Sequence, residues 1–304
     1  MVNKSLLKYS LRPLTKLTVI AIFLILNSCH NYDQTSRNMH HINDQINQKR
    51  IIGGAEVKEP SSYPFVVNIW LDIPEENTSR HFCGGSLISD KWILTAAHCV
   101  LEDKTESTQG TIDLKRLHLF VGGLKNDGSD GLIVKLKKIH VHPEYSWPHH
   151  DLALIELTEN VEGVRPVTLN QTQLSVNGQD LILATVIGWG FVDRAGSIQS
   201  SILKITQLKM ISKAQCSNDP FVIQRHIKIS DDILCTESSY GDNSSCPGDS
   251  GGPLFIEKNG EYIQIGVVSW GTSCRGRIYQ NSNIDAYADV YNGLSWIHQV
   301  MAKE

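Results

Sequence analysis

Short apolar segments recur along residues 51–304, separated by glycine, proline, asparagine and aspartate. They are rich in β-branched and aromatic residues, which favour β-strands, and the residues between them favour turns. The segments are residues 65–71, 86–88, 92–95, 118–121, 133–136, 181–186 and 265–270. Many short strands of this kind predict an antiparallel sandwich or barrel. One helix is expected at the C-terminus, where Leu294, Ile297, Val300 and Met301 recur at helical spacing.

The first 28 residues have the pattern of a secretory signal peptide. Basic residues precede an apolar run at residues 17–26, which suits a signal-peptide core and is short for a membrane span. An uncleaved signal anchor is the alternative to removal of this segment. Residues 29–50 are polar and predict a disordered linker or pro-segment. The expected organisation is therefore a signal peptide at residues 1–28, a linker at 29–50 and a folded domain at 51–304.

Cys29 stands at the end of the signal region and makes the cysteine count odd. The chain has seven cysteines, and the other six predict three disulfides in an exported protein. Six cysteines allow fifteen pairings, so their number alone does not choose one. Cys29 follows Leu26, Asn27 and Ser28, which resembles a bacterial lipobox and indicates a lipid anchor. An incidental cysteine in a discarded signal is the alternative.

Composition and charge narrow the expected partners. The chain has 304 residues, of which 41% are hydrophobic, and a formal net charge of −4 at pH 7. The apolar content is enough for a large core, and the charge gives no reason to expect a nucleic-acid partner. We expect an extracellular or periplasmic monomer, which associates with a membrane only if Cys29 is lipidated.

A candidate nucleophile lies in the glycine-rich segment at residues 246–254, where Ser250 follows Asp249 and precedes two glycines. Glycines let the backbone approach a substrate and aim N–H groups at a developing oxyanion. A serine hydroxyl is a weak nucleophile alone, so it needs a base and a group that orients the base. His98, in Leu-Thr-Ala-Ala-His-Cys, and Asp151, in Asp-Leu-Ala-Leu, offer these groups. Taken singly, the three motifs are also compatible with a turn, a structural histidine and the start of a strand.

These motifs, in the order His98, Asp151, Ser250, resemble those of the chymotrypsin/trypsin family of serine endopeptidases across residues 51–304. The resemblance implies an all-β fold of two packed six-stranded antiparallel β-barrels with a C-terminal α-helix. It also implies hydrolysis of peptide bonds in proteins through an acyl-enzyme, with no cofactor. Ser250 is then the nucleophile, His98 the general base and Asp151 the orienting acid. The N–H groups of Gly248 and Ser250 form the oxyanion hole. The family's disulfides correspond to Cys83–Cys99, Cys216–Cys235 and Cys246–Cys274.

The junction between Lys49-Arg50 and Ile51-Ile52-Gly53-Gly54 resembles the family's activation site. Cleavage after Arg50 creates an α-ammonium group on Ile51. In the family this group pairs with the acid before the nucleophile, which is Asp249 in this chain. Because the buried ion pair forms only after cleavage, it acts as a switch. An ordinary exposed dibasic pair is the alternative.

The residues expected to select the substrate depart from the trypsin pattern. Ser244, six residues before Ser250 and next to Ser245, falls at the pocket base where trypsin-like members carry aspartate. Asp285 aligns with the last strand of the pocket, where most relatives carry glycine. A buried carboxylate is costly without a partner, so Asp285 favours cleavage after arginine or lysine. Specificity for aromatic residues or leucine is the alternative, and Gly271 leaves the entrance open to a large side chain.

The surroundings of this pocket leave further alternatives open. The loop at residues 275–284 is longer than in trypsin-like members, so a shift in register would remove Asp285 from the pocket. Alternatively, Arg275 and Arg277 neutralise the acid. The segment Ser269-Trp270-Gly271 is expected to pair with the substrate backbone as an added strand.

Two clusters raise the question of a metal, and neither predicts a required one. They are the histidines His140, His142 and His149 and the loop residues Asn126, Asp127 and Asp130. The histidines lack the compact spacing of a metal-binding helix, so we expect solvated loop residues. The loop resembles a calcium loop found in some family members, but residues 122–124 lack the acid expected there.

Two other classes of function are compatible with the chain. A binding protein on a protease scaffold usually lacks a triad residue, whereas this chain keeps all three. A surface-tethered adhesin or toxin with secondary proteolysis requires the anchor at Cys29. The leading hypothesis is an exported serine endopeptidase made as a zymogen. Its expected partners are protein substrates, a protein inhibitor and an activating protease.

Overall fold

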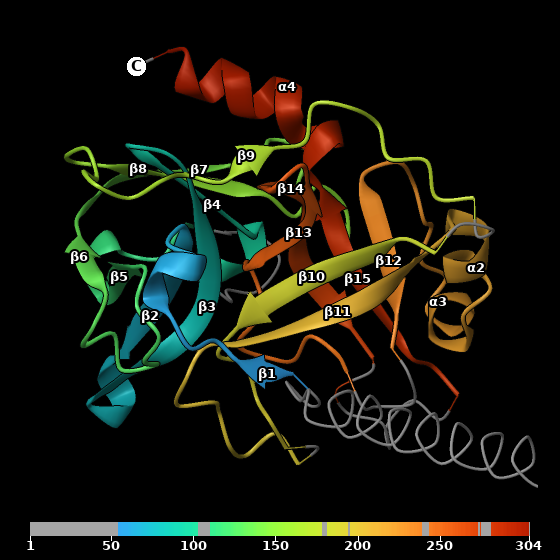
Figure 1. Ribbon diagram of the computed structural model, residues 1–304, viewed down its shortest axis with the longest axis horizontal. Helices are drawn as coiled ribbons and strands as arrows, with labels where there is room; N and C mark the ends of the chain where they lie inside the picture. Colours follow the sequence, from blue (N-terminus) through green and yellow to red (C-terminus); the bar gives the residue numbers. More distant parts are fainter. Residues whose placement is uncertain are drawn as a thin grey trace, which may run out of the picture. The chain divides into compact units, whose positions relative to one another are not determined.

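The computed structural model describes residues 54–102, 110–177, 181–193, 195–238, 243–272, 274 and 281–303. The expected signal peptide and linker, the Arg50–Ile51 junction, Arg275 and Arg277 lie outside these residues. Within the described part, no helix is both long and apolar enough to cross a membrane. Two sheets, shown side by side in Figure 1, account for most of the regular structure.

The first sheet contains seven strands in the order β6-β5-β2-β3-β4-β8-β7. They are β2 (Val66–Ile73), β3 (Thr78–Ser89), β4 (Trp92–Thr95), β5 (Leu117–Val121), β6 (Leu132–Val134), β7 (Leu136–Val141) and β8 (Ala153–Leu157). Only Lys135 separates β6 from β7, so one bent segment pairs with β5 through its first part and with β8 through its second. The sheet therefore curls round on itself, and it has six strands when this segment is counted once.

The second sheet has eight strands in the described part of the chain, and six of them form a closed antiparallel ring. Its strands are β1 (Ala55–Glu56), β9 (Thr168–Leu169), β10 (Leu183–Gly188), β11 (Lys204–Ile211), β12 (Ile233–Glu237), β13 (Pro253–Lys258), β14 (Glu261–Gly271) and β15 (Ile284–Asp289). The order β11-β10-β13-β14-β15-β12 closes because β12 also pairs with β11. The short strands β1 and β9 add to β11 and β14. The expected all-β fold of two packed barrels is confirmed.

The helices lie near the ends of strands. The expected C-terminal helix is α4 (Val290–Met301), which begins directly after β15 with Asp289 as its N-cap. Two more helices, α2 (Lys213–Ser217) and α3 (Pro220–Gln224), follow β11. Each has only five residues, too few for helical periodicity to reveal. Their signals are local ones: a capping box from Ser212 to Gln215, and proline after an aspartate N-cap.

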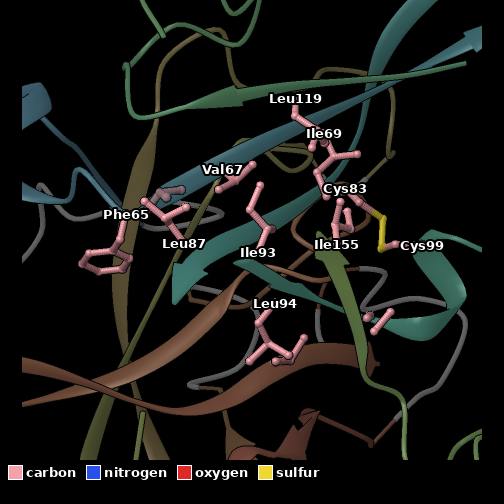
Figure 2. Close-up of a cluster of buried hydrophobic side chains, with 14 of the residues drawn as sticks. Phe65, Val67, Ile69, Cys83, Leu87, Ile93, Leu94, Cys99, Leu119 and Ile155 are labelled. Atoms are coloured by element: carbon pink, nitrogen blue, oxygen red, sulfur yellow. A yellow bond between two sulfur atoms is a disulfide. The ribbon is translucent and has the colours of Figure 1, made fainter. Parts of the chain in front are cut away.

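One buried apolar cluster extends across both sheets and packs them together. In the first sheet it includes the side chains shown in Figure 2, among them Ile69, Leu94 and Ile155. It continues into the second sheet through Trp189 and Phe255, which are buried almost completely. Burying one large apolar side chain stabilises the fold by about 1.5–3 kcal/mol. The two sheets are therefore held as one packed unit, with loops of both available to form a shared site.

The three disulfides form with the expected pairing. They are Cys83–Cys99, Cys216–Cys235 and Cys246–Cys274. The first joins β3 to the short 3₁₀ helix Ala97–Cys99, which carries His98. The third ties the loop before Ser250 to the loop after β14. Two of the three bonds therefore fix segments on which the candidate catalytic residues lie.

Candidate active site

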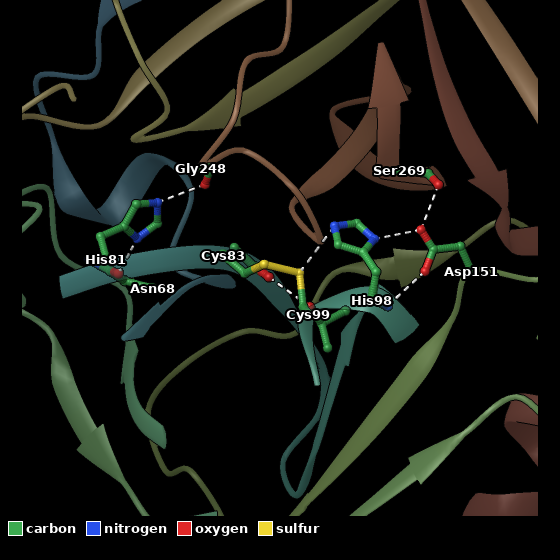
Figure 3. Close-up of a disulfide and its surroundings, with 10 residues drawn as sticks. Asn68, His81, Cys83, His98, Cys99, Asp151, Gly248 and Ser269 are labelled. Carbon is green, nitrogen blue, oxygen red and sulfur yellow. Dashed lines mark hydrogen bonds and ion pairs between the residues drawn. A yellow bond between two sulfur atoms is a disulfide. The ribbon is translucent and has the colours of Figure 1, made fainter. Parts of the chain in front are cut away.

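His98 and Asp151 are brought together by neighbouring strands of the first sheet. His98 follows β4, and Asp151 lies two residues before β8, which pairs with β4. His98 Nδ1 lies 2.7 Å from Asp151 Oδ2, and the backbone N–H of His98 donates to Oδ1 at 3.0 Å. Ser269, from β14 of the second sheet, donates its hydroxyl to Asp151 Oδ2 at 2.6 Å (Figure 3). Three donors from two sheets therefore orient one buried carboxylate.

The surroundings of Asp151 decide its charge. Burial raises the pKa of the Asp151 carboxyl, but the charge of His98 and the hydrogen bonds from His98 and Ser269 lower it. The net effect is a pKa below the ordinary value. Asp151 is therefore ionised at neutral pH and accepts the Nδ1 proton of His98. This arrangement leaves Nε2 as the ring nitrogen that can take a proton.

Ser250 faces the same cleft as His98. The cleft has a volume of about 550 Å³. Its lining consists of Arg80, His81, Phe82, Cys83, His98, Phe191, Gly196, Ser197, Gln199, Pro247, Gly248 and Ser250. Among the described hydrogen bonds, none joins the Ser250 hydroxyl to His98. Catalytic hydrogen bonds are often long or unaligned before substrate binds. The lack of a hydrogen bond between Ser250 and His98 is therefore compatible with a catalytic pair.

The turn that carries Ser250 is shaped by the glycines on either side of it. Gly248 has φ +97°, a conformation that favours glycine, and Gly251 has φ +79°. A Cβ on Gly251 would lie 2.5 Å from the carbonyl oxygen of Gly84. The backbone N–H of Gly84 also donates to the Ser250 carbonyl at 2.7 Å, so β3 packs directly against the serine loop. The glycines are needed because two backbones approach each other closely here.

His81 is a residue of this site that the sequence did not single out. Its ring is buried, with Nε2 2.7 Å from the carbonyl oxygen of Gly248 and Nδ1 2.7 Å from Asn68 Oδ1 (Figure 3). His81 therefore holds the carbonyl side of the turn that carries Ser250. Its position two residues before Cys83 was the only available signal, because no motif surrounds it.

Asp249 is fully buried behind the serine loop. Its carboxylate accepts the N–H of Gly190 and the N–H of Cys246, each at 2.8 Å. Burial raises the pKa of Asp249 to about 6, although these two hydrogen bonds lower it. A Cβ on Gly190 would lie 2.4 Å from Asp249 Oδ2, so glycine is needed for the close approach. Ile51, the expected partner of this acid, lies outside the described residues.

The residues expected to select the substrate lie side by side. Asp285 on β15 is directly opposite Gly271 on β14, and its Oδ2 accepts the N–H of Ser245 at 3.0 Å. Ser244 and Asp285 are both fully buried. A Cβ on Gly271 would lie 2.3 Å from Asp285 Oδ1, so the acid approaches the backbone of β14 closely. The ladder between β14 and β15 thus gives Asp285 a defined position next to Ser245.

Aromatic side chains surround the end of β14. Trp270 lies 6.4 Å from Trp147 and 5.8 Å from Phe221, measured between ring centroids. Trp147 is exposed, whereas Phe221 is buried. Neither Trp147 nor Phe221 was expected at this site, because both lie far from Trp270 in the sequence. Three separate segments therefore supply an apolar surface next to the Ser269-Trp270-Gly271 strand.

The histidines and acidic loop residues outside the triad have structural partners. The expectation of solvated histidines is wrong for His142, which is only 7% exposed because it stacks on His150 and packs against Trp296. His149 lies 3.2 Å from Asp232. The loop acid Asp130 accepts the N–H groups of residues 124 and 125, which shapes the turn.

Comparison with known proteins defines the class of this chain. Residues 51–297 match the Trypsin family. Trypsin 5G1 of Aedes aegypti is 32% identical over 256 residues, which cover 83% of this chain and 85% of that protein. Coagulation factor XII of Bos taurus is 31% identical over 265 residues, which cover 82% of this chain but only 39% of that protein. The chain belongs to the trypsin family. It is a serine-type endopeptidase of the S1 class and acts on protein substrates.

Proposed function

We propose that the protein cleaves proteins through a triad of Ser250, His98 and Asp151. The observation that carries this assignment is the buried Asp151 carboxylate. It accepts both the ring and the backbone N–H of His98, next to the cleft that Ser250 lines. An orienting acid with this geometry serves a histidine that must present Nε2 to a nucleophile. Asp151 also supports the positive charge that develops on His98.

The reaction proceeds in two steps that share one histidine. His98 Nε2 takes the hydroxyl proton as Ser250 Oγ attacks the peptide carbonyl carbon, and the carbonyl oxygen becomes an oxyanion. His98 then gives this proton to the leaving amine as the C–N bond breaks, which leaves an ester on Ser250. Water attacks the ester with His98 as base. The acid product leaves, and the Ser250 hydroxyl is restored.

The backbone N–H groups of Gly248 and Ser250 form the proposed oxyanion hole. Gly248 at φ +97° and the bond from His81 to its carbonyl support a fixed orientation of this turn. A donor that is already aimed at the oxyanion needs no reorganisation during the reaction. One such donor contributes roughly 3 kcal/mol to stabilising the transition state.

Cleavage between Arg50 and Ile51 is the proposed activation step. Asp249 supports it, because its buried carboxylate lies on the residue before Ser250 and receives only backbone N–H groups in the described hydrogen bonds. A new α-ammonium group on Ile51 would supply the positive charge that favours ionised Asp249. Residues 29–50 are then the pro-segment, and residues 51–304 are the mature domain.

Asp285 supports a preference for arginine or lysine before the scissile bond. It lies beside Gly271 and Ser245, which we assign to the walls of the pocket, with Ser244 at its base. A substrate cation that reaches this buried carboxylate gains a charge-assisted hydrogen bond. Specificity for aromatic residues or leucine is the alternative, in which Asp285 serves the structure of the pocket alone.

Export is proposed from the first 28 residues and fits the three disulfides, which persist in oxidising compartments. Lipidation of Cys29 is a further proposal, which mass spectrometry of the mature N-terminus tests. A protein inhibitor and an activating protease are the proposed partners beyond the substrates.

Ser250→Ala tests the triad directly. We expect protein cleaved after Arg50 to react with a fluorophosphonate probe, and the variant to lose this labelling. The value of kcat should fall on the order of 10⁶-fold, because the nucleophile is absent. Ser197→Ala, which changes another serine of the cleft, is the control and should keep its label. Undiminished labelling of Ser250→Ala would overturn the assignment, and no turnover by the wild-type protein would favour a binding protein on a protease scaffold.

A further inference from the structure

The cleft that His98 and Ser250 line also contains residues that the proposed reaction does not use. Two of them are the aromatic residues Phe82 and Phe191, and a third is Arg80. Among the described residues that line the cleft, none is aspartate or glutamate, and Arg80 is the only lysine or arginine. The cleft therefore combines one permanent positive charge with apolar surface, in a chain whose net charge is −4.

This cleft lies on the side of His98 that faces away from β14. In Figure 3, Asp151 and Ser269 are on one side of His98, and the cleft residue Gly248 is on the other. Ser269 lies on β14, whose next residues lead to the pocket proposed for the side chain before the scissile bond. A peptide that continues in extended form past Ser250 therefore enters the cleft with the residues that follow the scissile bond.

Strand β3 sets how far Arg80 lies from the reacting serine. The N–H of Gly84 donates to the Ser250 carbonyl at 2.7 Å, and Arg80 precedes Gly84 on the same strand. The strand segment between them spans about 13 Å, and less where β3 bulges opposite Ile69. An extended peptide covers this distance in about four residues, and the long arginine side chain shortens it. Arg80 is therefore within reach of the second to fourth residue after the scissile bond.

The charge of Arg80 is accessible to a substrate. Its side chain is 59% exposed, and its partner in the described ion pairs is Glu76, at 3.7 Å. Exposed pairs of this kind are weak, because water screens them and two long side chains must be ordered. A substrate carboxylate held in the cleft can therefore replace Glu76. The planar guanidinium group can then bind both oxygens of that carboxylate.

We propose that the cleft binds the substrate segment after the scissile bond, and that Arg80 selects an acidic side chain at its second to fourth position. The preferred substrates are then proteins in which aspartate or glutamate closely follows the cleaved bond. This selection is separate from the pocket at Asp285, which concerns the residue before the bond. It rests on the proposed function, because it requires a peptide bond held at Ser250.

Two kinds of fluorogenic substrate test this selection with the protein cleaved after Arg50. The first is a peptidyl aminocoumarin amide, which has no residue after the scissile bond and measures the reaction alone. The second is a series of quenched peptides that differ only at the first four positions after the bond, with aspartate, alanine or lysine at each. We expect kcat/KM for the best aspartate peptide to exceed that for its alanine counterpart about threefold to tenfold. The lysine counterpart should be the poorest of the three.

The two substrates distinguish the possible failures. Hydrolysis of the amide without any preference for aspartate overturns the selection by Arg80 and leaves the proposed function intact. No hydrolysis of the amide or the peptides means that the proposed function has failed, and the selection with it.

Variants at the ion pair change the preference in opposite directions. The ratio of kcat/KM for aspartate and alanine peptides is compared within each variant, so the amount of active enzyme cancels. Arg80→Gln should bring this ratio to about one, and Arg80→Glu should make the lysine peptide better than the aspartate peptide. Glu76→Gln removes the competing carboxylate and should raise the ratio about twofold, with hydrolysis of the aminocoumarin amide unchanged.

Arg165→Gln is the matched control, because Arg165 is an exposed arginine paired with Glu261 at 2.8 Å and does not line the cleft. It should keep the wild-type ratio. Added sodium chloride should bring the wild-type ratio toward one, because salt screens an exposed ion pair. A preference for aspartate that persists in Arg80→Gln would place the selecting group elsewhere and overturn the proposal.

Discussion

Asp151 is the residue on which the geometry of the candidate triad depends. Asp151→Asn keeps the size of the side chain but replaces one carboxylate oxygen with an NH₂ group. His98 would then face a donor at Nδ1 or take the opposite tautomer, which removes the lone pair from Nε2. We expect kcat to fall on the order of 10⁴-fold, with KM little changed. Steady-state kinetics with a peptide ester measure this, and an unimpaired kcat would contradict the role of Asp151.

Asp249 predicts how the stability of the uncleaved chain depends on pH. Its folded pKa of about 6 lies above the ordinary value of 3.8, so the folded state binds the proton more tightly than the unfolded state. The resulting stabilisation is complete below about pH 4 and is lost as the pH rises through 6. The difference corresponds to roughly 3 kcal/mol. Urea unfolding between pH 4 and 7.5 measures the loss in wild type.

Asp249→Asn provides the comparison for this pH dependence. Asparagine does not titrate, so the part of the decline due to residue 249 should be absent from the variant. Subtracting the two curves removes the contribution of other buried acids, such as Asp289, whose pKa burial also raises to about 6. Parallel curves for the two proteins would show that Asp249 is equally easy to ionise in the folded and unfolded states.

Residues with a sequence motif were predictable, and residues placed by tertiary contacts were not. His98, Asp151 and Ser250 were singled out as candidates because their neighbours resemble those of a known family. In the structure His98 and Ser250 line one cleft, and Asp151 contacts His98. His81 has no motif, and its role depends on the Gly248 carbonyl, which is 167 residues away. The burial of His142 likewise depends on stacking with His150. Local sequence contains no information on either contact.

At the scale of elements, the pairing of β14 with β15 determines where Asp285 lies relative to the other residues of the proposed specificity pocket. Gly271 lies opposite Asp285 in this ladder, and a shift by one residue would turn the acid to the other face. The sequence left this register open because of the longer loop at residues 275–284. The strands themselves were predictable from their apolar composition. The short helices α2 and α3 were not, because their stability depends on caps and tertiary packing.

Asp285→Asn tests this element as the source of specificity. Asparagine keeps an oxygen that can accept the N–H of Ser245 but removes the charge. We expect cleavage after arginine and lysine to weaken on the order of 100-fold relative to cleavage after phenylalanine and leucine. A peptide-library profile of the activated enzyme measures the ratio. Asp231→Asn, a change on the surface, is the control, and an unchanged profile of Asp285→Asn would favour the aromatic or leucine alternative.

At the scale of the whole molecule, the candidate site exists only where the two sheets meet. His98 and Asp151 lie beside β4 and β8 of the first sheet, whereas Ser250 precedes β13 and Ser269 lies in β14 of the second sheet. Contacts across the boundary include the bond from Ser86 on β3 to Gln264 on β14 at 2.7 Å. The position of Ser250 relative to His98 is therefore set by packing between sheets, which short motifs do not report.

This dependence predicts that the two sheets unfold together. Phe255, on β13, is 1% exposed and packs edge-on against Phe65 at 5.8 Å, so Phe255→Ala leaves a cavity at the boundary. We expect a loss of about 3–5 kcal/mol in the free energy of unfolding, whereas Ile133→Ala, at a residue that is 73% exposed, should cost less than about 0.5 kcal/mol. Near-ultraviolet circular dichroism and loss of fluorophosphonate labelling should follow one coincident thermal transition in both variants. Two separate transitions would show that the sheets are independent units, and that the active site depends on their association rather than on one shared core.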